Sequence, residues 1–481
     1  MSVRVRFAPS PTGYLHVGGL RTALYNYLFA RRNGGTFVLR IEDTDRARYV
    51  EGAVENLIQT LAWAGLDYDE GPLRGGPGAP YVQSERTEIY RSHARQLIDK
   101  GRAYYAFDTA AELEEMRKSL EKQGLFPRYD RRALTLTPDE VQSRLASGVP
   151  AVVRMKIPDS TTIAFDDIIR GRVEFSSEQI DDQVLLKSDG FPTYHLANVV
   201  DDHLMGISHV IRGEEWLSST PKHVLLYQYF GWDLPAFAHL PLLLNPDKSK
   251  LSKRQGDVAV EDYKQKGYLR EALVNFVAFL GWNPGDEREI FFMDQLVKEF
   301  SLERVGKSGA VFNVDKLNWL NQQHLKLKSN EELAVLIKPY VQAHQIEKKG
   351  EGYFLKVIGL LKERIAFPKD FVEMSAYFFD DPESVDDAGI KKYWEEGTND
   401  RMRVLADRLG SLSEYSHASI ETTVRQFAEE LQMKPTKLIH PARLALSGRT
   451  TGPGLFEMME LLGQETVVRR LRSAAEKLKA L

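Results

Sequence analysis

The sequence contains no cysteine, which excludes disulfide bonds and zinc sites with thiolate ligands. It has no run of 18 apolar residues and no apolar leader segment, so nothing in it predicts a membrane-spanning helix or secretion. Internal repeats and low-complexity segments are also missing. From these absences we expect a globular, cytoplasmic protein that has no membrane partner.

Hydrophobic residues make up 43% and charged residues 27% of the 481 positions, the balance of a globular protein with several domains. The net charge of -4 argues against a uniformly basic nucleic-acid binder. Residues 1–50 and 432–481 nevertheless each carry a net charge of +5, whereas residues 370–400 carry -8. The basic blocks indicate local surfaces that can contact phosphate, although solvated helix faces are the simpler explanation for any one block.

The most informative stretch is Arg6-Phe-Ala-Pro-Ser-Pro-Thr-Gly-Tyr-Leu-His-Val-Gly-Gly19. Alternating apolar residues at positions 3, 5 and 7 predict a half-buried strand before it, and apolar residues at helical spacing predict a helix over 18–32. The start of such a helix offers free N–H groups, and glycines there let a nucleotide approach the backbone closely. The stretch therefore indicates a nucleotide site; the alternative is an ordinary strand-to-helix turn whose prolines and glycines only set its shape.

A second strand is predicted over 36–41, after the helix C-cap signal Asn33-Gly34-Gly35. Strand, helix and strand in this order predict a right-handed crossover and a parallel sheet. The loop over 42–46 then places carboxylates at the carboxyl edge of the sheet, where ligands of such sheets bind. Alternatively, Thr44 or Asp45 caps the helix that follows.

The segment 86–182 has a mixed pattern that predicts an inserted domain. We expect helices over 86–100, 110–123 and 138–147, and strands over 103–107, 151–157 and 162–165. The apolar run 183–188 is predicted to resume the first fold, and a further strand is predicted over 209–212.

Lys250-Leu-Ser-Lys-Arg254 places three cations and a serine on a loop flanked by glycine and proline. This composition suits a clamp for polyphosphate, although basic loops are also common on ordinary surfaces. From about residue 260 onward the hydrophobic spacing is almost wholly helical. The C-terminal third is therefore predicted to be a helical region with a basic end.

Five motifs occur together in the order and spacing of class I aminoacyl-tRNA synthetases: Ala8-Pro-Ser-Pro-Thr-Gly13, His16-Val-Gly-Gly19, Arg40-Ile-Glu-Asp-Thr-Asp45, Tyr194-His-Leu-Ala-Asn198 and Lys250-Leu-Ser-Lys-Arg254. The second and fifth correspond to the signatures called HIGH and KMSKS. Over essentially its whole length the chain resembles the bacterial glutamyl-tRNA synthetases. It departs from the class signature at Gly19, where a second histidine is missing as in many glutamyl members, and from several relatives at Tyr14, where they carry histidine.

The resemblance implies an α/β fold with a parallel-sheet, Rossmann-like catalytic domain over 1–85 and 183–245. An α+β insertion over 86–182 would bind the acceptor end of tRNA, and residues 246–328 would carry the KMSKS-type loop and contact the tRNA stem. Residues 329–481 would form an all-helical anticodon-binding region. Because glutaminyl relatives use β-barrels there, the helical pattern favours glutamate over glutamine.

The implied reaction has two steps. The α-carboxylate of L-glutamate attacks the α-phosphorus of ATP and releases pyrophosphate, and the glutamyl group of the adenylate then passes to the terminal ribose of tRNA(Glu). ATP is the substrate, with Mg²⁺ held mainly by phosphate oxygens and water, and no zinc is expected. We expect the protein to act as a monomer.

By resemblance, three sets of residues are assigned to this chemistry. The catalytic residues are His16, Lys250 and Lys253, and the ATP-binding residues are Pro9, Ser10, His16, Gly18, Gly19, Lys250, Ser252 and Lys253. The glutamate-binding residues are Arg6, Ser10, Glu42, Tyr194, Asn198 and Arg212. Arg46 and Arg364 are assigned to tRNA, with Arg364 at the position where the family can read the last anticodon base.

A buried γ-carboxylate requires a cation, and arginine offers a bidentate fork that lysine lacks. Arg6 and Arg212 are the candidates for this role, and Glu42 suits the substrate ammonium. The alternative for each arginine is that it lies on a strand face and pairs with a neighbouring acid.

Three other functions remain to be weighed. A non-discriminating enzyme would also charge tRNA(Gln), and Arg364 argues against it. A nucleotidyltransferase that adenylates a small carboxylate without tRNA would not need the helical C-terminal region. A non-catalytic tRNA-binding protein would not need His16, Lys250 and Lys253.

Overall fold

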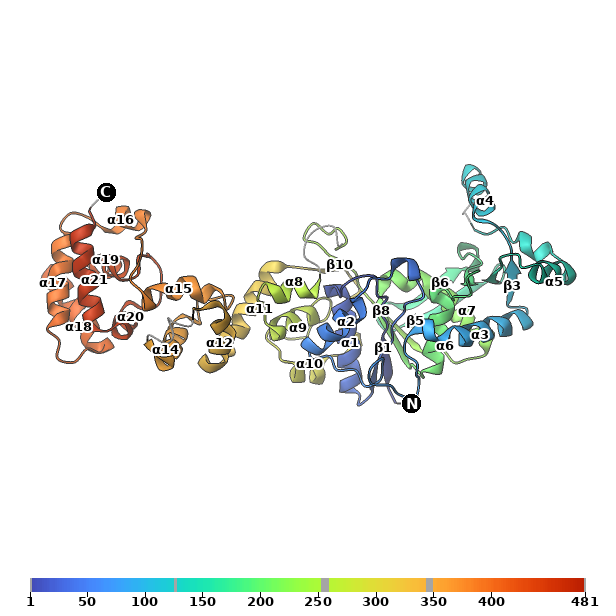
Figure 1. Cartoon of the computed structure of the whole chain (residues 1–481), viewed down its shortest axis with the longest axis horizontal. Helices are drawn as coiled ribbons and strands as arrows, with labels where there is room; N and C mark the ends of the chain where they lie inside the picture. The colour runs from blue at the N-terminus through green and yellow to red at the C-terminus, as the bar shows by residue number, and fades with distance from the viewer. Residues whose placement is uncertain (1, 125–127, 252–258, 343–348, 480–481) are drawn as a thin grey trace. The chain divides into compact units, whose positions relative to one another are not determined.

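The computed structural model describes residues 2–124, 128–251, 259–342 and 349–479. The chain divides into two compact units. The first comprises Met1–Lys266 and Arg270–Leu317, and the second comprises Gly267–Leu269 and Asn318–Leu481. Figure 1 shows that the strands belong to the first unit and that the C-terminal part is helical.

The first unit begins with the predicted strand–helix–strand crossover. β1 (Arg4–Phe7) pairs in parallel with β2 (Thr36–Leu39), and α1 (Val17–Arg32) connects them. Asn33 is the C-cap of α1, and Gly34 has a left-handed φ of 58°. The parallel arrangement and the helix boundary are therefore as the sequence predicted.

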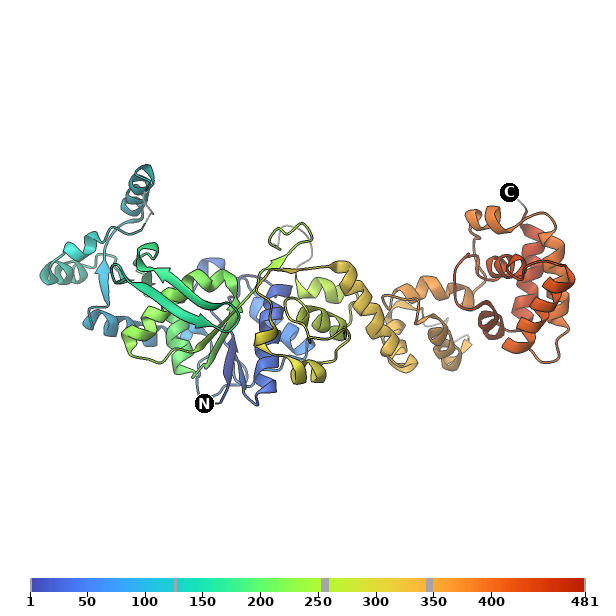
Figure 2. The same cartoon turned by 180° about the vertical axis from the view of Figure 1, so that it is seen from behind.

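A four-stranded sheet of order β6-β5-β9-β8 continues this architecture. β8 (His209–Gly213) and β9 (Ala236–Leu240) are parallel, and β1 begins beside β8 because Ser208 N donates to Arg4 O at 2.9 Å. Helices α6 (Tyr194–Leu204) and α7 (Thr220–Phe230) cover one face of the strands and α1 lies on the other, as both views show (Figures 1 and 2).

The hairpin of β5 (Thr162–Asp167) and β6 (Gly171–Ser176) is antiparallel and joins this sheet where Asp167 pairs with Phe237 of β9. Figure 2 shows its two long arms in green. β6 was not predicted, although Val173 and Phe175 alternate with Arg172 and Glu174 in the pattern of a half-buried strand.

The inserted segment contains α3 (Thr87–Asp99), α4 (Ala110–Lys122) and α5 (Pro138–Ala146). Its own antiparallel sheet has the order β3-β4-β7, formed by Ala103–Ala106, Val152–Met155 and Val184–Leu186. The prediction that 183–188 resumes the first fold was wrong, because β7 pairs with β4. A short apolar run specifies a buried strand but not its partner.

Of the remaining elements of the first unit, α2 (Ala53–Trp63) and β10 (Leu243–Leu244) contribute residues to the cavity described below. Helix α2 follows β2, and β10 pairs in parallel with β11 (Ala310–Val311). The remaining helices are α8 (Val260–Gln265), α9 (Arg270–Ala278), α10 (Met293–Glu299) and α11 (Val314–Leu327), the last of which crosses the boundary between the units.

In its described residues the second unit is built from helices, as predicted. They are α12 (Asn330–Ile337), α14 (Glu351–Leu361), α15 (Asp370–Phe379), α16 (Asp387–Tyr393), α17 (Thr398–Gly410), α18 (His417–Glu430), α19 (Thr436–Ser447), α20 (Leu455–Leu462) and α21 (Gln464–Lys477). Arg470 of α21 is buried, donates to the carbonyls of Tyr377 and Leu446, and pairs with Asp381 at 2.9 Å. Its guanidinium therefore connects the ends of α15 and α19 to α21.

Candidate active site

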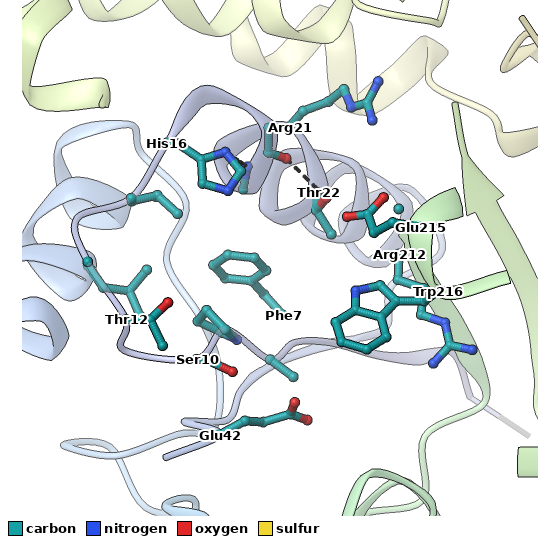
Figure 3. Close-up of a pocket in the computed structure, with 18 of the residues that line it drawn as sticks. Phe7, Ser10, Thr12, His16, Arg21, Thr22, Glu42, Arg212, Glu215 and Trp216 are labelled. Carbon is teal, nitrogen blue, oxygen red and sulfur yellow. Dashed lines mark hydrogen bonds between the residues drawn. The ribbon is translucent and has the colours of Figure 1, made fainter. Parts of the chain in front are cut away.

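A cavity of about 620 Å³ lies at the carboxyl ends of β1 and β8 and at the N-terminus of α1. This is the edge at which open parallel sheets bind ligands, and the volume is typical of small-molecule sites. Figure 3 shows His16 on one side of the Phe7 ring, Ser10 and Glu42 on the other, and Arg212 and Trp216 along a third side. The described residues of the predicted ATP and glutamate sites all line it: Arg6, Pro9, Ser10, His16, Gly18, Gly19, Glu42, Tyr194, Asn198, Arg212 and Lys250.

His16 is the N-cap of α1. Its Nδ1 accepts a hydrogen bond from Gly19 N at 3.2 Å, so in the neutral ring the proton is on Nε2. A Cβ at Gly18 would lie 3.0 Å from His16 Cε1, and a Cβ at Gly19 would lie 2.7 Å from Leu15 Cδ1. The two glycines therefore leave room for the imidazole and for close packing of the turn, and the helix N-terminus favours an anion.

Arg212 is a buried cation that has no carboxylate partner in the part of the chain that the structure describes. Its Nη1 donates to Tyr194 Oη at 2.8 Å and to His223 Nδ1 at 3.3 Å, and its Nε donates to His239 Nε2 at 3.1 Å. Its Nη2 donates to Thr220 Oγ1 at 2.9 Å. Among the described residues no Asp or Glu oxygen lies within 4.0 Å of the guanidinium, although the residue is only 4% exposed. A buried charge of this kind favours an anionic ligand in the cavity.

Arg6 differs from Arg212, because it pairs with a carboxylate as the structural alternative predicted. Its Nε and Nη2 donate to the two oxygens of Asp202 at 3.0 and 3.2 Å. Arg40 donates to Asp202 at 2.7 Å and to Glu42 at 2.9 Å. Burial raises the pKa of Glu42, an effect that Arg40 opposes, whereas Arg6 and Arg40 overcome the burial of Asp202 and lower its pKa.

Asp201, the neighbour of Asp202 on α6, connects the cavity region to the inserted segment. Asp201 accepts from Arg86 Nε at 2.8 Å, from Gln83 Nε2 at 2.9 Å and from Tyr90 Oη at 2.8 Å. Burial beside Asp201 raises the pKa of Tyr90 far above its usual value, so the phenol stays protonated as a donor.

Several functional candidates were not singled out in the sequence. Tyr194, Asn198 and Asp202 recur every four residues and lie on one face of α6, so this spacing could have identified Asp202. Trp216 follows β8 and packs on Tyr194 with a centroid distance of 4.2 Å. No spacing signal marks the buried His239, because one histidine in an apolar strand is usually part of a core.

The other four predicted residues are not among the described residues that line the cavity. Ser252 and Lys253 lie outside the described residues. Arg46 is exposed and lies 3.8 Å from Asp43, and Arg364 is exposed in the turn that follows α14 of the second unit. The assignments of Arg46 and Arg364 to tRNA remain predictions.

The two buried histidines next to Arg212 should make the stability of the first unit depend on pH. Burial lowers the pKa of His239 to about 4 and that of His223 well below its usual 6.5. Unfolded histidines titrate near 6.5, so below that pH the unfolded chain takes up protons that the folded chain does not. We expect stability to be complete above about pH 6.5 and to fall with decreasing pH by about 1.4 kcal/mol per pH unit for each histidine.

Scanning calorimetry between pH 7.5 and 5 measures this loss in the transition of the first unit. His239→Gln removes one of the buried histidines whose pKa is lowered and should reduce the dependence, to which His195, His203 and His209 of the same unit also contribute. An unchanged pH slope in this variant would contradict the assignment.

The described residues contain no group of three or more His, Asp or Glu side chains arranged to hold a metal ion. A search of the same residues finds no helix with the length and apolar character that a bilayer crossing requires.

Comparison with protein families identifies both parts of the chain. Residues 2–319 match a profile described as "tRNA synthetases class I (E and Q), catalytic domain". Residues 332–475 match a profile described as "Anticodon binding domain". The order of the two profiles agrees with the order of an α/β unit followed by a helical unit.

Full-length relatives agree with these profiles. The glutamate–tRNA ligase of Chloroherpeton thalassium is 56% identical over 99% of this chain and 98% of its own, and that of Pelodictyon phaeoclathratiforme is 54% identical with the same coverage. A crystal structure of a glutamate tRNA ligase from Elizabethkingia meningosepticum in complex with its amino acid has a TM-score of 0.92 and 43% identity, with 100% of both chains covered. Since the motifs, the fold and the full-length relatives agree, the chain belongs to the glutamate–tRNA ligases of the class I aminoacyl-tRNA synthetase family.

Proposed function

We propose that the protein ligates L-glutamate to tRNA(Glu) in two steps, through a glutamyl-adenylate formed from ATP in the cavity. The observation that carries this proposal is Arg212, a buried guanidinium that faces the cavity and has no carboxylate partner among the described residues. The γ-carboxylate of glutamate supplies the missing anion, and an uncharged glutamine side chain does not.

The nucleotide lies on the α1 side of the cavity in this proposal. His16 Nε2–H and the N-terminal amides of α1 donate to phosphate oxygens, and Lys250 adds positive charge at the cavity rim. Phosphoryl transfer requires mainly alignment and stabilisation of negative charge, which these groups supply. Mg²⁺ enters with ATP as part of the nucleotide substrate.

The amino acid lies between Arg212 and Glu42. Tyr194 Oη accepts from Arg212, so its own proton can be donated to the substrate carboxylate. Glu42 suits the ammonium group, because one of its oxygens already accepts from Arg40 and from Asn198 while the carboxylate remains at the cavity wall. Arg6 acts mainly through Asp202, which fixes its guanidinium beside the cavity.

Transfer to tRNA uses the remaining parts of the chain. We assign the acceptor end to the inserted segment 86–182, the stem to residues 246–328 and the anticodon to the helical residues 329–481. Arg46 and Arg364 are exposed, as residues that contact nucleic acid must be. The helical anticodon profile favours this assignment over an adenylating enzyme that acts without tRNA.

Aminoacylation with labelled glutamate or glutamine, each tested with purified tRNA(Glu) and tRNA(Gln), decides between the possibilities. Charging of tRNA(Glu) with glutamate alone is the expected result. Glutamate on both tRNAs would identify a non-discriminating enzyme, and adenylate formation without charging of either tRNA would overturn the proposal.

The basic loop makes a further prediction at Lys253, whose role rests on the KMSKS signature. Loss of one preorganised charge that stabilises the transition state typically costs about 10²–10³-fold in rate. Lys253→Ala should therefore slow glutamate-dependent pyrophosphate exchange, measured with tRNA present, by about this factor while glutamate KM changes little. Lys264→Ala, which removes an exposed lysine of α8, is the control. An unchanged exchange rate in Lys253→Ala would remove Lys253 from the mechanism.

A further inference from the structure

Arg212 is held by neutral groups. The acceptors of its N–H groups are two imidazole nitrogens, a phenol and a threonine hydroxyl. Buried arginines are more often paired with a carboxylate, as Arg6 and Arg86 are in this protein. The arrangement satisfies the hydrogen bonds of the guanidinium and leaves its positive charge uncancelled.

One of these acceptors is oriented by a buried acid. Asp167, at the end of β5, accepts from His239 Nδ1 at 2.6 Å, and both side chains are inaccessible to solvent. The carboxylate also accepts from the backbone N–H groups of Ile169, Arg170 and His239 at 2.8 to 3.1 Å. Hydrogen bonds from these amides and from the His239 ring N–H stabilise the negative charge of Asp167.

The bond to Asp167 determines which nitrogen of His239 carries the proton. A carboxylate accepts only, so the proton is on Nδ1 and Nε2 presents its lone pair to Arg212 Nε at 3.1 Å. The other tautomer would direct an N–H group at the Arg212 N–H group. Burial keeps the ring neutral at physiological pH, since the pKa of His239 is lowered to about 4.

We propose that Asp167 and His239 are positioning residues that hold Arg212 in place while leaving its charge available, and that they thereby help the enzyme select an acidic amino acid over its neutral amide. The inference rests on the proposed function, in which Arg212 binds the γ-carboxylate. A carboxylate in direct contact with Arg212 would satisfy the same donors but compete with the substrate for the charge. The His239 ring keeps the Asp167 carboxylate apart from the Arg212 guanidinium, and offers Arg212 only a neutral, oriented acceptor.

The test compares two substitutions of similar size at His239. His239→Gln retains a neutral acceptor for Arg212 and a donor for Asp167, whereas His239→Leu provides neither. Steady-state aminoacylation at saturating tRNA should show a glutamate KM raised by about tenfold or more in His239→Leu and by no more than about threefold in His239→Gln. The preference for glutamate over glutamine should fall in proportion in His239→Leu, with the KM for ATP changed by less than about twofold in both.

Asp167→Asn is a nearly isosteric substitution that tests whether the position of the proton on the His239 ring matters. The asparagine Oδ1 can still accept from Ile169 N and Arg170 N, but its NH₂ group replaces the oxygen that accepts from His239 N. That group donates to His239 Nδ1 and forces the ring proton onto Nε2, against Arg212. We expect the glutamate KM to rise by about tenfold or more, as in His239→Leu.

Equal glutamate KM values for His239→Leu, His239→Gln and the unmodified protein would overturn the inference. So would a rise in KM shared equally by ATP and glutamate, because that result indicates a general loss of structure. Arg212→Ala separates this outcome from failure of the proposed function. If Arg212→Ala loses glutamate while the His239 and Asp167 variants keep it, only the positioning role is wrong; if Arg212→Ala keeps glutamate, the assignment of the pocket itself is wrong.

Discussion

Arg212→Ala should reduce kcat/KM for glutamate by about 10²–10⁴-fold, the range expected when one partner of a buried charge pair is removed. The substrate carboxylate would then enter a cavity in which Tyr194 still lines the wall but the positive charge of Arg212, at the end of β8, is gone. The loss should appear mainly in glutamate KM, with the KM for ATP nearly unchanged. Aminoacylation at saturating ATP and tRNA measures both constants.

Two further variants make this result specific. Arg212→Lys keeps the charge but not the planar fork, so it should recover only part of the loss. Arg172→Ala removes an arginine of β6 whose side chain is 59% exposed and which is not part of the cavity, and should leave both KM values unchanged. Glutamate kinetics in Arg212→Ala close to those of Arg172→Ala would show that the γ-carboxylate binds elsewhere.

Asp202→Asn should destabilise the first unit by about 3–5 kcal/mol, the cost of breaking a buried ion pair from one side. Asp202 is 1% exposed and receives hydrogen bonds from both Arg6 and Arg40. In the variant these guanidinium groups stay buried with one negative charge fewer, and Arg40 retains only Glu42 and the more distant Asp201. We expect the calorimetric midpoint of the first unit to fall by roughly 10 °C.

Glu88→Gln is the control for this measurement. It breaks the pair of Glu88 and Arg91 on the surface of α3, where the Glu88 side chain is 81% exposed and the pair contributes about 0–1 kcal/mol. A midpoint shift in Asp202→Asn as small as that of Glu88→Gln would mean that water, rather than Asp202, satisfies the two arginines.

Hydrophobic spacing predicted most of the helices and the parallel pairing of β1 with β2, because these depend on short-range periodicity. The partner of β7 was predicted wrongly. Three apolar residues contain no information on whether the neighbouring strand is parallel or antiparallel, and the pairing of β7 with β4 is settled by contacts about 30 residues apart.

Arg6 shows a second limit of prediction from sequence, because strand periodicity did not predict its burial. Strand alternation placed Arg4 and Arg6 together on the polar face of β1, but Arg6 is 3% exposed. Its burial depends on Asp202, a residue on a distant helix that the alternation of β1 does not reveal. The motifs contain about half of the cavity-lining residues, whereas the buried groups behind them, Asp167 and His239, have no local pattern.

The separation in sequence of the paired groups has a consequence for how the protein is made. Arg6 and Asp202 are 196 positions apart, and Arg40 and Asp202 are 162 apart. At synthesis rates of about 5–20 residues per second, roughly 10–40 s pass between the translation of Arg6 and that of its partner. During this interval β1 and β2 cannot bury their arginines against α6. The cavity is therefore completed late in synthesis, and glutamate, which requires Arg212 in the proposed function, cannot assist the folding of the first 200 residues.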